Sequence, residues 1–245
     1  MSVSLLLVLA ACILVMAILY SSVGHGGASG YIAILALFSL APAAFKPTAL
    51  VLNILVSAIA TFYFARAGHF SRHLFWPFAA TSIPFSFLGG YLSLPTHVYQ
   101  PLVGIVLLAS ACRLFLRKYP EATDVIPPPI AAALVVGAAL GFLSGLTGVG
   151  GGIFLSPLLL LLGWGRVKEV SAVAALFILV NSIAGLLGHI GSLQAMPRYM
   201  PILAVAALAG GITGSFFGAS RIPASGIVRA LSVVLIIAGF KLLFV

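Results

Sequence analysis

Charged residues are scarce in this chain. Only 6% of its 245 residues are Asp, Glu, Lys or Arg, while 62% are hydrophobic; an ordinary soluble domain is about a quarter charged. Residues 1–45, 73–112 and 125–165 carry no charge at all. Because a membrane helix needs about 20 apolar residues, each stretch has room for two crossings. The composition excludes a soluble globular fold and predicts an all-α, multi-pass membrane protein.

Acidic residues are scarcer still. The chain has three, Glu121 and Asp124 in a polar segment and Glu169 at the edge of an apolar one. A metal-cation transporter or proton pump normally places carboxylates within its spans, so we expect neither, and we expect no metal site or cofactor. The catalytic patterns Ser-His-Asp, His-Glu-x-x-His and Gly-Lys-Ser/Thr are also missing, so no enzyme is predicted.

Cysteines and basic residues exclude two further classes. Cys12 and Cys112 both lie inside apolar runs, which gives neither a disulfide framework nor metal-ligand spacing. The net charge of +9 comes from basic residues placed singly or in pairs at the ends of apolar runs. That placement is typical of loops that set membrane topology and lacks the basic, aromatic-lined face of a nucleic-acid-binding protein.

An internal repeat divides the chain. Residues 24–27 (GHGG) correspond to residues 148–151 (GVGG), and at the same separation of 124 residues, five of the seven positions 54–60 are identical to 178–184. The proline-rich segment 117–129 predicts a polar central loop. We therefore expect a first transmembrane repeat over residues 1–116 and a second over 130–245.

Each half contains five apolar segments. They lie near 3–21, 27–44, 47–65, 75–93 and 98–116 in the first half, and near 130–146, 151–164, 169–190, 199–219 and 225–244 in the second. The second segment of each half is short and opened by glycine, so it could be a re-entrant hairpin, which would leave eight crossings.

The basic residues favour ten crossings. With ten, one side of the membrane collects nine Lys and Arg residues and the other three, whereas re-entrant second segments give seven and five. The positive-inside rule therefore predicts ten crossings with both termini outside the cytoplasm. Because five is odd, the halves would have opposite orientation, as in the inverted repeats of many secondary transporters.

Two glycine clusters are the candidate binding site. They are Gly24, His25, Gly26 and Gly27, and Gly148, Gly150, Gly151 and Gly152. Each should break a helix inside the membrane and leave the next helix with free N–H groups and a positive dipole end, which together bind anions. The alternative is close helix packing through small residues.

Polar side chains accompany the clusters. Asn53 and Ser57 are four residues apart and share a helix face, and Asn181 and Ser182 fall at or beside the position equivalent to Ser57. These four can bind an oxyanion or join helices by hydrogen bonds. His25 could carry a proton in coupled transport, because its ordinary pKa is near physiological pH, or it could be a structural histidine.

Residues 141–152 (GFLSGLTGVGGG), followed by Pro157, resemble the repeat signature of the TauE/SafE sulfite-exporter family, and residues 24–27 resemble its first-half counterpart. The resemblance covers essentially the whole chain. It implies a permease of the bacterial cytoplasmic membrane for small anions such as sulfite, sulfonates or related organic acids, coupled to an ion gradient. It also implies eight spans in a four-plus-four duplication, in conflict with the charge distribution.

These observations predict a secondary transporter that moves a small anion by alternating access, with the proton as the expected coupling ion. The alternatives are a passive anion channel and, less well supported, a membrane-embedded enzyme or a non-transporting assembly factor. The expected partners are the anion and the lipid bilayer.

Overall fold

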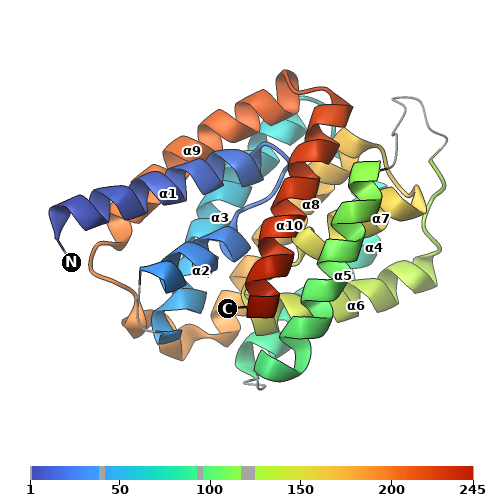
Figure 1. The fold of residues 1–245 in the computed structure, drawn as a ribbon. Helices are drawn as coiled ribbons and strands as arrows, with labels where there is room; N and C mark the ends of the chain where they lie inside the picture. The colour runs from blue at the N-terminus through green and yellow to red at the C-terminus, as the bar shows by residue number, and fades with distance from the viewer. Residues whose placement is uncertain (1, 39–41, 93–95, 117–124, 245) are drawn as a thin grey trace.

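The computed structural model describes residues 2–38, 42–92, 96–116 and 125–244, and all regular structure within these ranges is helical (Figure 1). The helices are α1 (Val3–Ser21), α2 (Ala28–Leu37), α3 (Pro42–Arg66), α4 (Arg72–Tyr91), α5 (Thr96–Leu116), α6 (Ile130–Thr147), α7 (Gly152–Leu162), α8 (Val167–Gly188), the short 3₁₀ helix η1 (Ile190–Ala195), α9 (Met200–Ser220) and α10 (Ala224–Phe244). The prediction of an all-α protein is confirmed. Within the described ranges, six helices are long and apolar enough to cross a membrane.

The predicted central loop, 117–129, lies partly outside the described residues. Its described part, 125–129, is not helical.

Helices α2 and α7 are shorter than the predicted segments 27–44 and 151–164. They have 10 and 11 residues, about 15 Å each, half the roughly 30 Å of a hydrocarbon core. Gly163, at φ 70°, ends α7 in a left-handed cap. Residues 42–44 belong to α3 instead, because Pro42 takes the first turn of a helix, where proline is tolerated. Pro47, the predicted start, lies inside α3.

Glycines bring α9 against α1. Gly210 packs on the backbone of Leu14, and two turns further along, Gly218 packs on the backbone of Ser22. A methyl group at either glycine would collide with a carbonyl oxygen. Since the contacts follow the same order along both helices, α1 and α9 are parallel.

Helix α6 packs on α4 in the same way. Gly137 lies against the backbone of Phe78, and Gly145 lies against that of Ser86, so these helices are also parallel. Such close, glycine-mediated contacts are the usual way in which helices associate where lipid removes the hydrophobic drive between them.

The helices alternate between two directions. Helices α1, α3, α5 and α9 run one way, and α4, α6, α8 and α10 run the other way. Each long helix of residues 1–116 thus runs opposite to the helix five places later in the chain (Figure 1). We call the end where α1 begins and α10 finishes the terminal end, and the end where α5 finishes and α6 begins the central-loop end.

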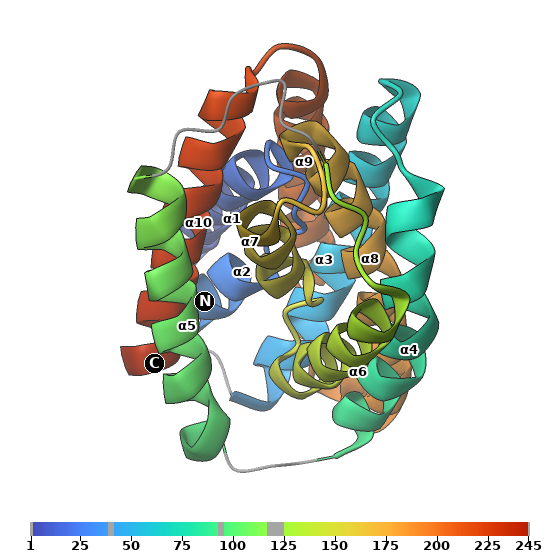
Figure 2. The same ribbon diagram turned by 90° about the vertical axis from the view of Figure 1, so that its right-hand side faces the viewer.

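The packing has two layers with the short helices between them. A row of helices in the order α1, α9, α3, α8, α4 and α6 forms one layer, and α5 pairs with α10 in the other. Helix α2 contacts α3 and α10, while α7 contacts α8 and α5. Figure 2 shows α2 and α7 in the interior between α5 and α10 and the row.

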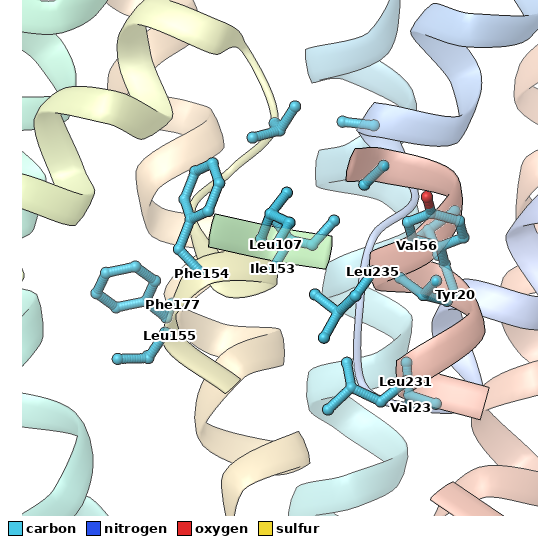
Figure 3. Packing of buried hydrophobic residues seen from close by; sticks show 14 of the residues in the cluster. Tyr20, Val23, Val56, Leu107, Ile153, Phe154, Leu155, Phe177, Leu231 and Leu235 are labelled. Carbon is cyan, nitrogen blue, oxygen red and sulfur yellow. The ribbon is translucent and has the colours of Figure 1, made fainter. Parts of the chain in front are cut away.

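One apolar cluster joins these layers. It takes side chains from α1, α3, α5, α7, α8 and α10 (Figure 3). Tyr20, Leu107, Leu155, Phe177 and Leu235 are all fully or almost fully buried there. The half-helices α2 and α7 are therefore held from both sides, which fixes their first turns in the middle of the protein.

The described basic residues divide unequally between the two ends. The central-loop end carries Arg66, Arg72, Arg113, Arg166, Lys168, Arg221 and Arg229, and the terminal end carries Lys46, Arg198 and Lys241. Arg117 and Lys118, which the ten-crossing prediction assigns to the larger group, lie outside the described residues, and the number of crossings stays a prediction.

We predict that the central-loop end faces the cytoplasm, because loops rich in Lys and Arg are retained there. A cysteine added after Val245 should then react with a membrane-impermeant thiol reagent in intact cells. A cysteine placed within residues 117–129 should react only after the cells are opened. A cytoplasmic C-terminus would contradict the prediction.

Candidate functional site

Both glycine clusters end a helix inside the protein, as predicted. Residues 22–27 connect α1 to α2, and residues 148–151 connect α6 to α7; all of them are buried. Gly27 has φ 101° and Gly151 has φ 78°, and each is the N-cap of the short helix that follows. This left-handed backbone suits glycine, which has no Cβ to clash.

Each connection packs on a long helix from the other half of the chain. Gly24 lies against the backbone of Ser171 in α8, and Gly148 lies beside the side chain of Lys46 in α3. Gly150 lies against both Asn53 of α3 and Ser182 of α8. The two connections therefore meet α3 and α8, the central helices of the row.

Asn53 links the parts of this site. Its Oδ1 accepts a hydrogen bond from the N–H of Ala28 at 3.1 Å, in the first turn of α2. Its Nδ2 donates to Ser182 Oγ at 2.8 Å and to the carbonyl oxygen of Val149 at 3.4 Å. The Gly27 N-cap has no side chain to offer, so the amide of Asn53 acts as a cap supplied from another helix.

A small buried cavity lies at the first turn of α2. It is lined by Tyr20, His25, Gly26, Gly27, Ala28, Ser29, Val149, Ile153 and Ile178. Its volume is about 10 Å³, about the least that holds one water molecule. Because Ile153 belongs to the first turn of α7, the N-terminal turns of both short helices border the same cavity.

His25 lines the cavity and contacts α7. Its Nε2 is 2.8 Å from Ser156 Oγ, and the ring also interacts with the backbone of Gly152. Nδ1 is buried and has no hydrogen-bond partner of good geometry among the described residues. The histidine thus bridges the first cluster to the first two turns of the second short helix.

The other predicted residues lie further from the cavity. Ser57 donates only to the carbonyl of Ile54 in its own helix, at 3.4 Å. Asn181 donates to Ser82 Oγ at 3.1 Å and to the carbonyl of Phe177 at 2.8 Å, so it joins α8 to α4. Gly148, Gly150, Gly151 and Gly152 form the second connection and the start of α7 without lining the cavity themselves.

Three polar residues of the site escaped the sequence analysis. Tyr20 and Ser29 line the cavity and are joined by a hydrogen bond of 2.9 Å, and Ser156 is the partner of His25. Tyr20 and Ser29 flank the first cluster closely in the sequence, so proximity could have indicated them. Ser156 gave no such signal, because it meets His25 only through the packing of α7.

We predict that Asn53→Ala destabilises the folded protein by about 1–3 kcal/mol, because it leaves three buried groups without their partner. Ser57→Ala, one turn away on the same helix and equally buried, is the matched control and should change stability by less than about 0.5 kcal/mol. Unfolding of both variants in detergent measures the difference. Equal stability of the two variants would show that Asn53 does not join these elements.

Known proteins resemble this chain along most of its length. Residues 9–242 match the family described as "Sulfite exporter TauE/SafE". The "Probable membrane transporter protein y4hK" of Sinorhizobium fredii is 42% identical over 240 residues, which cover 96% of this chain and 97% of that protein. The "Probable membrane transporter protein MJ0441" of Methanocaldococcus jannaschii is 32% identical over 116 residues, covering 44% of this chain and 42% of that protein. No solved structure matches the chain. This multi-pass membrane protein therefore belongs to the TauE/SafE sulfite exporter family, a family of membrane transporters and not of enzymes.

Proposed function

We propose that the protein is a secondary transporter that moves a small anion, such as sulfite, a sulfonate or a related organic acid, across the bacterial cytoplasmic membrane by alternating access. One observation carries the proposal: the first turns of α2 and α7 border one buried cavity. The N-terminus of a helix offers unpaired N–H groups and about half a positive charge, which together bind anions without a buried Lys or Arg.

The contacts of Asn53 support a binding role for this cavity. The Ala28 N–H donates to Asn53 Oδ1, and the oxygen of a bound anion would take the place of that acceptor. Asn53 Nδ2 and Ser182 Oγ, which are 2.8 Å apart, could then turn toward the anion as further donors. Asn53 Nδ2 and Ser182 Oγ would then bind the anion together with the Ala28 N–H.

The charge distribution favours an anion over a metal cation. Glu169, the one acidic residue in the described ranges, lies in the first turn of α8 at the central-loop end. In the described structure no carboxylate lines the cavity. Metal cations in membranes require carboxylate or carbonyl ligands, and the cavity has no carboxylate to offer. The positive ends of the two short helices would also repel a cation.

The burial of the cavity favours a gated transporter over a passive channel. Its lining side chains, including His25, Ser29 and Ile153, are all buried, so this point is closed to both ends. Sulfite has four heavy atoms, more than a cavity of about 10 Å³ accepts. Binding would therefore require α2 and α7 to move apart, and alternating access supplies such a step.

The opposed helix directions support alternating access. We propose that residues 1–116 and 130–245 form an inverted repeat of five segments each, with α2 and α7 as the broken, half-length members. Neither short helix is long enough to span the bilayer alone. Each nevertheless leads the chain back toward the end from which the preceding long helix started, so the order of directions is that of a ten-crossing protein. In transporters of this plan, the substrate binds at broken helices near the middle of the membrane, between the repeats.

His25 is the proposed proton carrier. It lies in the first connection, borders the cavity and bonds to Ser156 of α7. Protonation of its ring would add a positive charge beside the bound anion, which would couple the two binding events. The hydrogen bond to Ser156 would hold the ring in place during this change.

The choice of substrate is the first test. In proteoliposomes, we expect saturable uptake of at least one of sulfite, sulfoacetate and acetate, faster with a proton gradient than without, and no saturable uptake of divalent metal ions. His25→Gln should abolish the effect of the gradient. Saturable metal uptake would overturn the proposal, and anion flux indifferent to any gradient would indicate a channel instead.

The second test separates binding from folding. Gly27→Ala would place a methyl group 2.6 Å from the Tyr31 ring, with the backbone at φ 101°. We expect it to lower anion transport per folded protein at least about tenfold, because the methyl group reduces the space for a ligand at the N-terminus of α2. Gly151 does not line the cavity, but its methyl group would approach Phe177 to 2.9 Å at the N-cap of α7, so Gly151→Ala should lower transport by displacing the first turn of that helix.

Gly163→Ala is the matched control. Gly163 has φ 70° but has no atom within 4 Å of the added methyl group, so the variant carries the backbone strain without filling the site. Its transport per folded protein should stay within about twofold of the unaltered protein. If all three variants lose transport only in proportion to lost folded protein, the glycine clusters are packing elements.

A further inference from the structure

Two buried hydroxyl groups lie beside the N-caps of the short helices and have no hydrogen-bond partner among the described residues. They belong to Tyr31 of α2 and to Ser144 in the last turn of α6, and both side chains are completely buried. A buried hydroxyl without a partner is unfavourable. Two of them at corresponding places therefore call for an explanation.

The Tyr31 side chain folds back over the start of its own helix. Its backbone N–H donates to the carbonyl oxygen of Gly27 at 2.9 Å. A methyl carbon added to Gly27 would lie 2.7 Å from the Tyr31 hydroxyl oxygen. The hydroxyl thus lies against the N-cap of α2, and Gly27 lines the cavity. Tyr20 shows the usual arrangement of a buried tyrosine, because its hydroxyl is hydrogen-bonded to Ser29.

The Ser144 hydroxyl lies beside the N-cap of the other short helix. A methyl carbon added to Gly151 would lie 3.4 Å from Ser144 Oγ. Gly151 gives α7 no side-chain cap, and the first N–H groups of a helix have no partner within it. The hydroxyls of Thr147 and Ser232 donate to a carbonyl one turn earlier in their own helices. Ser144 makes no such bond, so its donor is available to a ligand at this helix end.

The internal repeat does not account for the two placements. The two N-cap glycines are equivalent positions, 124 residues apart, but at the same separation Tyr31 corresponds to Leu155, and Ser144 corresponds to Tyr20. One hydroxyl reaches its N-cap from within the short helix, and the other reaches it from the preceding long helix. Different residues that put the same group at both helix ends indicate a requirement for a donor there.

We propose that Tyr31 Oη and Ser144 Oγ are ligands of the transported anion, and that each donates a hydrogen bond to an oxygen of a small oxyanion at the N-terminus of α2 or α7. The inference rests on the proposed anion transport and adds two side-chain donors to the helix ends. The cavity of about 10 Å³ is too small for the anion, so these bonds form when α2 and α7 move apart. Directed O–H donors also favour an ion that carries several oxygen acceptors.

Water and sodium are the other ligands that a hydroxyl accepts. A water molecule beside each hydroxyl would satisfy it without any role in transport. A sodium ion would be bound through the hydroxyl oxygens, but the positive dipole end of the adjacent short helix opposes a cation there. The position of both hydroxyls at helix N-termini therefore favours an anion.

The test is sulfite binding to the full-length protein in nanodiscs of neutral phosphatidylcholine, measured by titration calorimetry with sulfoacetate and acetate as further probes. We expect Tyr31→Phe and Ser144→Ala each to raise the Kd about tenfold, because each removes a hydrogen bond to a charged group. Neither variant should lower the temperature of thermal unfolding, because the protein without ligand loses no hydrogen bond.

Ser215→Ala is the matched control. Ser215 is as buried as Ser144, and its hydroxyl also has no hydrogen-bond partner in the described part of the chain. It lies within α9, outside both connections. Its removal should change the Kd less than twofold.

The outcomes distinguish the possible roles of the two hydroxyls. If all three variants bind sulfite equally well, the hydroxyls hold water at most, and the inference is wrong. If Tyr31→Phe and Ser144→Ala unfold at lower temperature with unchanged Kd, the hydroxyls are structural, which also contradicts it. Sodium binding without an anion, weakened in these two variants, would contradict it as well. An unaltered protein that binds none of the three anions would overturn both this inference and the proposed function, whereas saturable anion uptake with two unaffected variants overturns the inference alone.

Discussion

Backbone groups inside a bilayer must find their hydrogen-bond partners within the protein, and this structure is arranged around that constraint. The breaks after α1 and α6 place irregular backbone in the interior, where no lipid can satisfy it. Asn53 supplies an acceptor to the Ala28 N–H and a donor to the Val149 carbonyl. Because a single side chain serves both connections, they lie together beside α3 and α8, the central helices of the row.

Glycine has two separate roles in the fold. Within α6 and α9, residues such as Gly145 and Gly218 let one backbone touch another, and these contacts join helices from different halves of the chain. At the connections, Gly27 and Gly151 instead adopt left-handed backbone and begin the short helices. The first role makes the two halves interdependent, since α1 packs on α9 and α4 packs on α6. The second role exposes helix ends to the interior.

These helix ends place partial positive charge in the interior of a protein that has almost no acidic residues and few buried basic ones. Partial charges spread over several N–H groups cost less to bury than a full charge on Lys or Arg. Lys46 and Lys241, which carry full charges, instead lie at the terminal end of their helices.

The sequence by itself determined the class of the protein, the bounds of most helices and the positions at which helices break. Long uncharged runs have one stable solution in a bilayer, and glycines such as Gly27 and Gly151 end helices through local backbone preference. The contacts of the site were decided by tertiary structure. The local sequence around each residue does not indicate that Asn53 caps α2 whereas Asn181 joins α8 to α4. Nor does it indicate that Ser156 contacts His25. Those partners lie on helices distant in the sequence, and only the close packing of α3, α7 and α8 brings them within hydrogen-bonding distance.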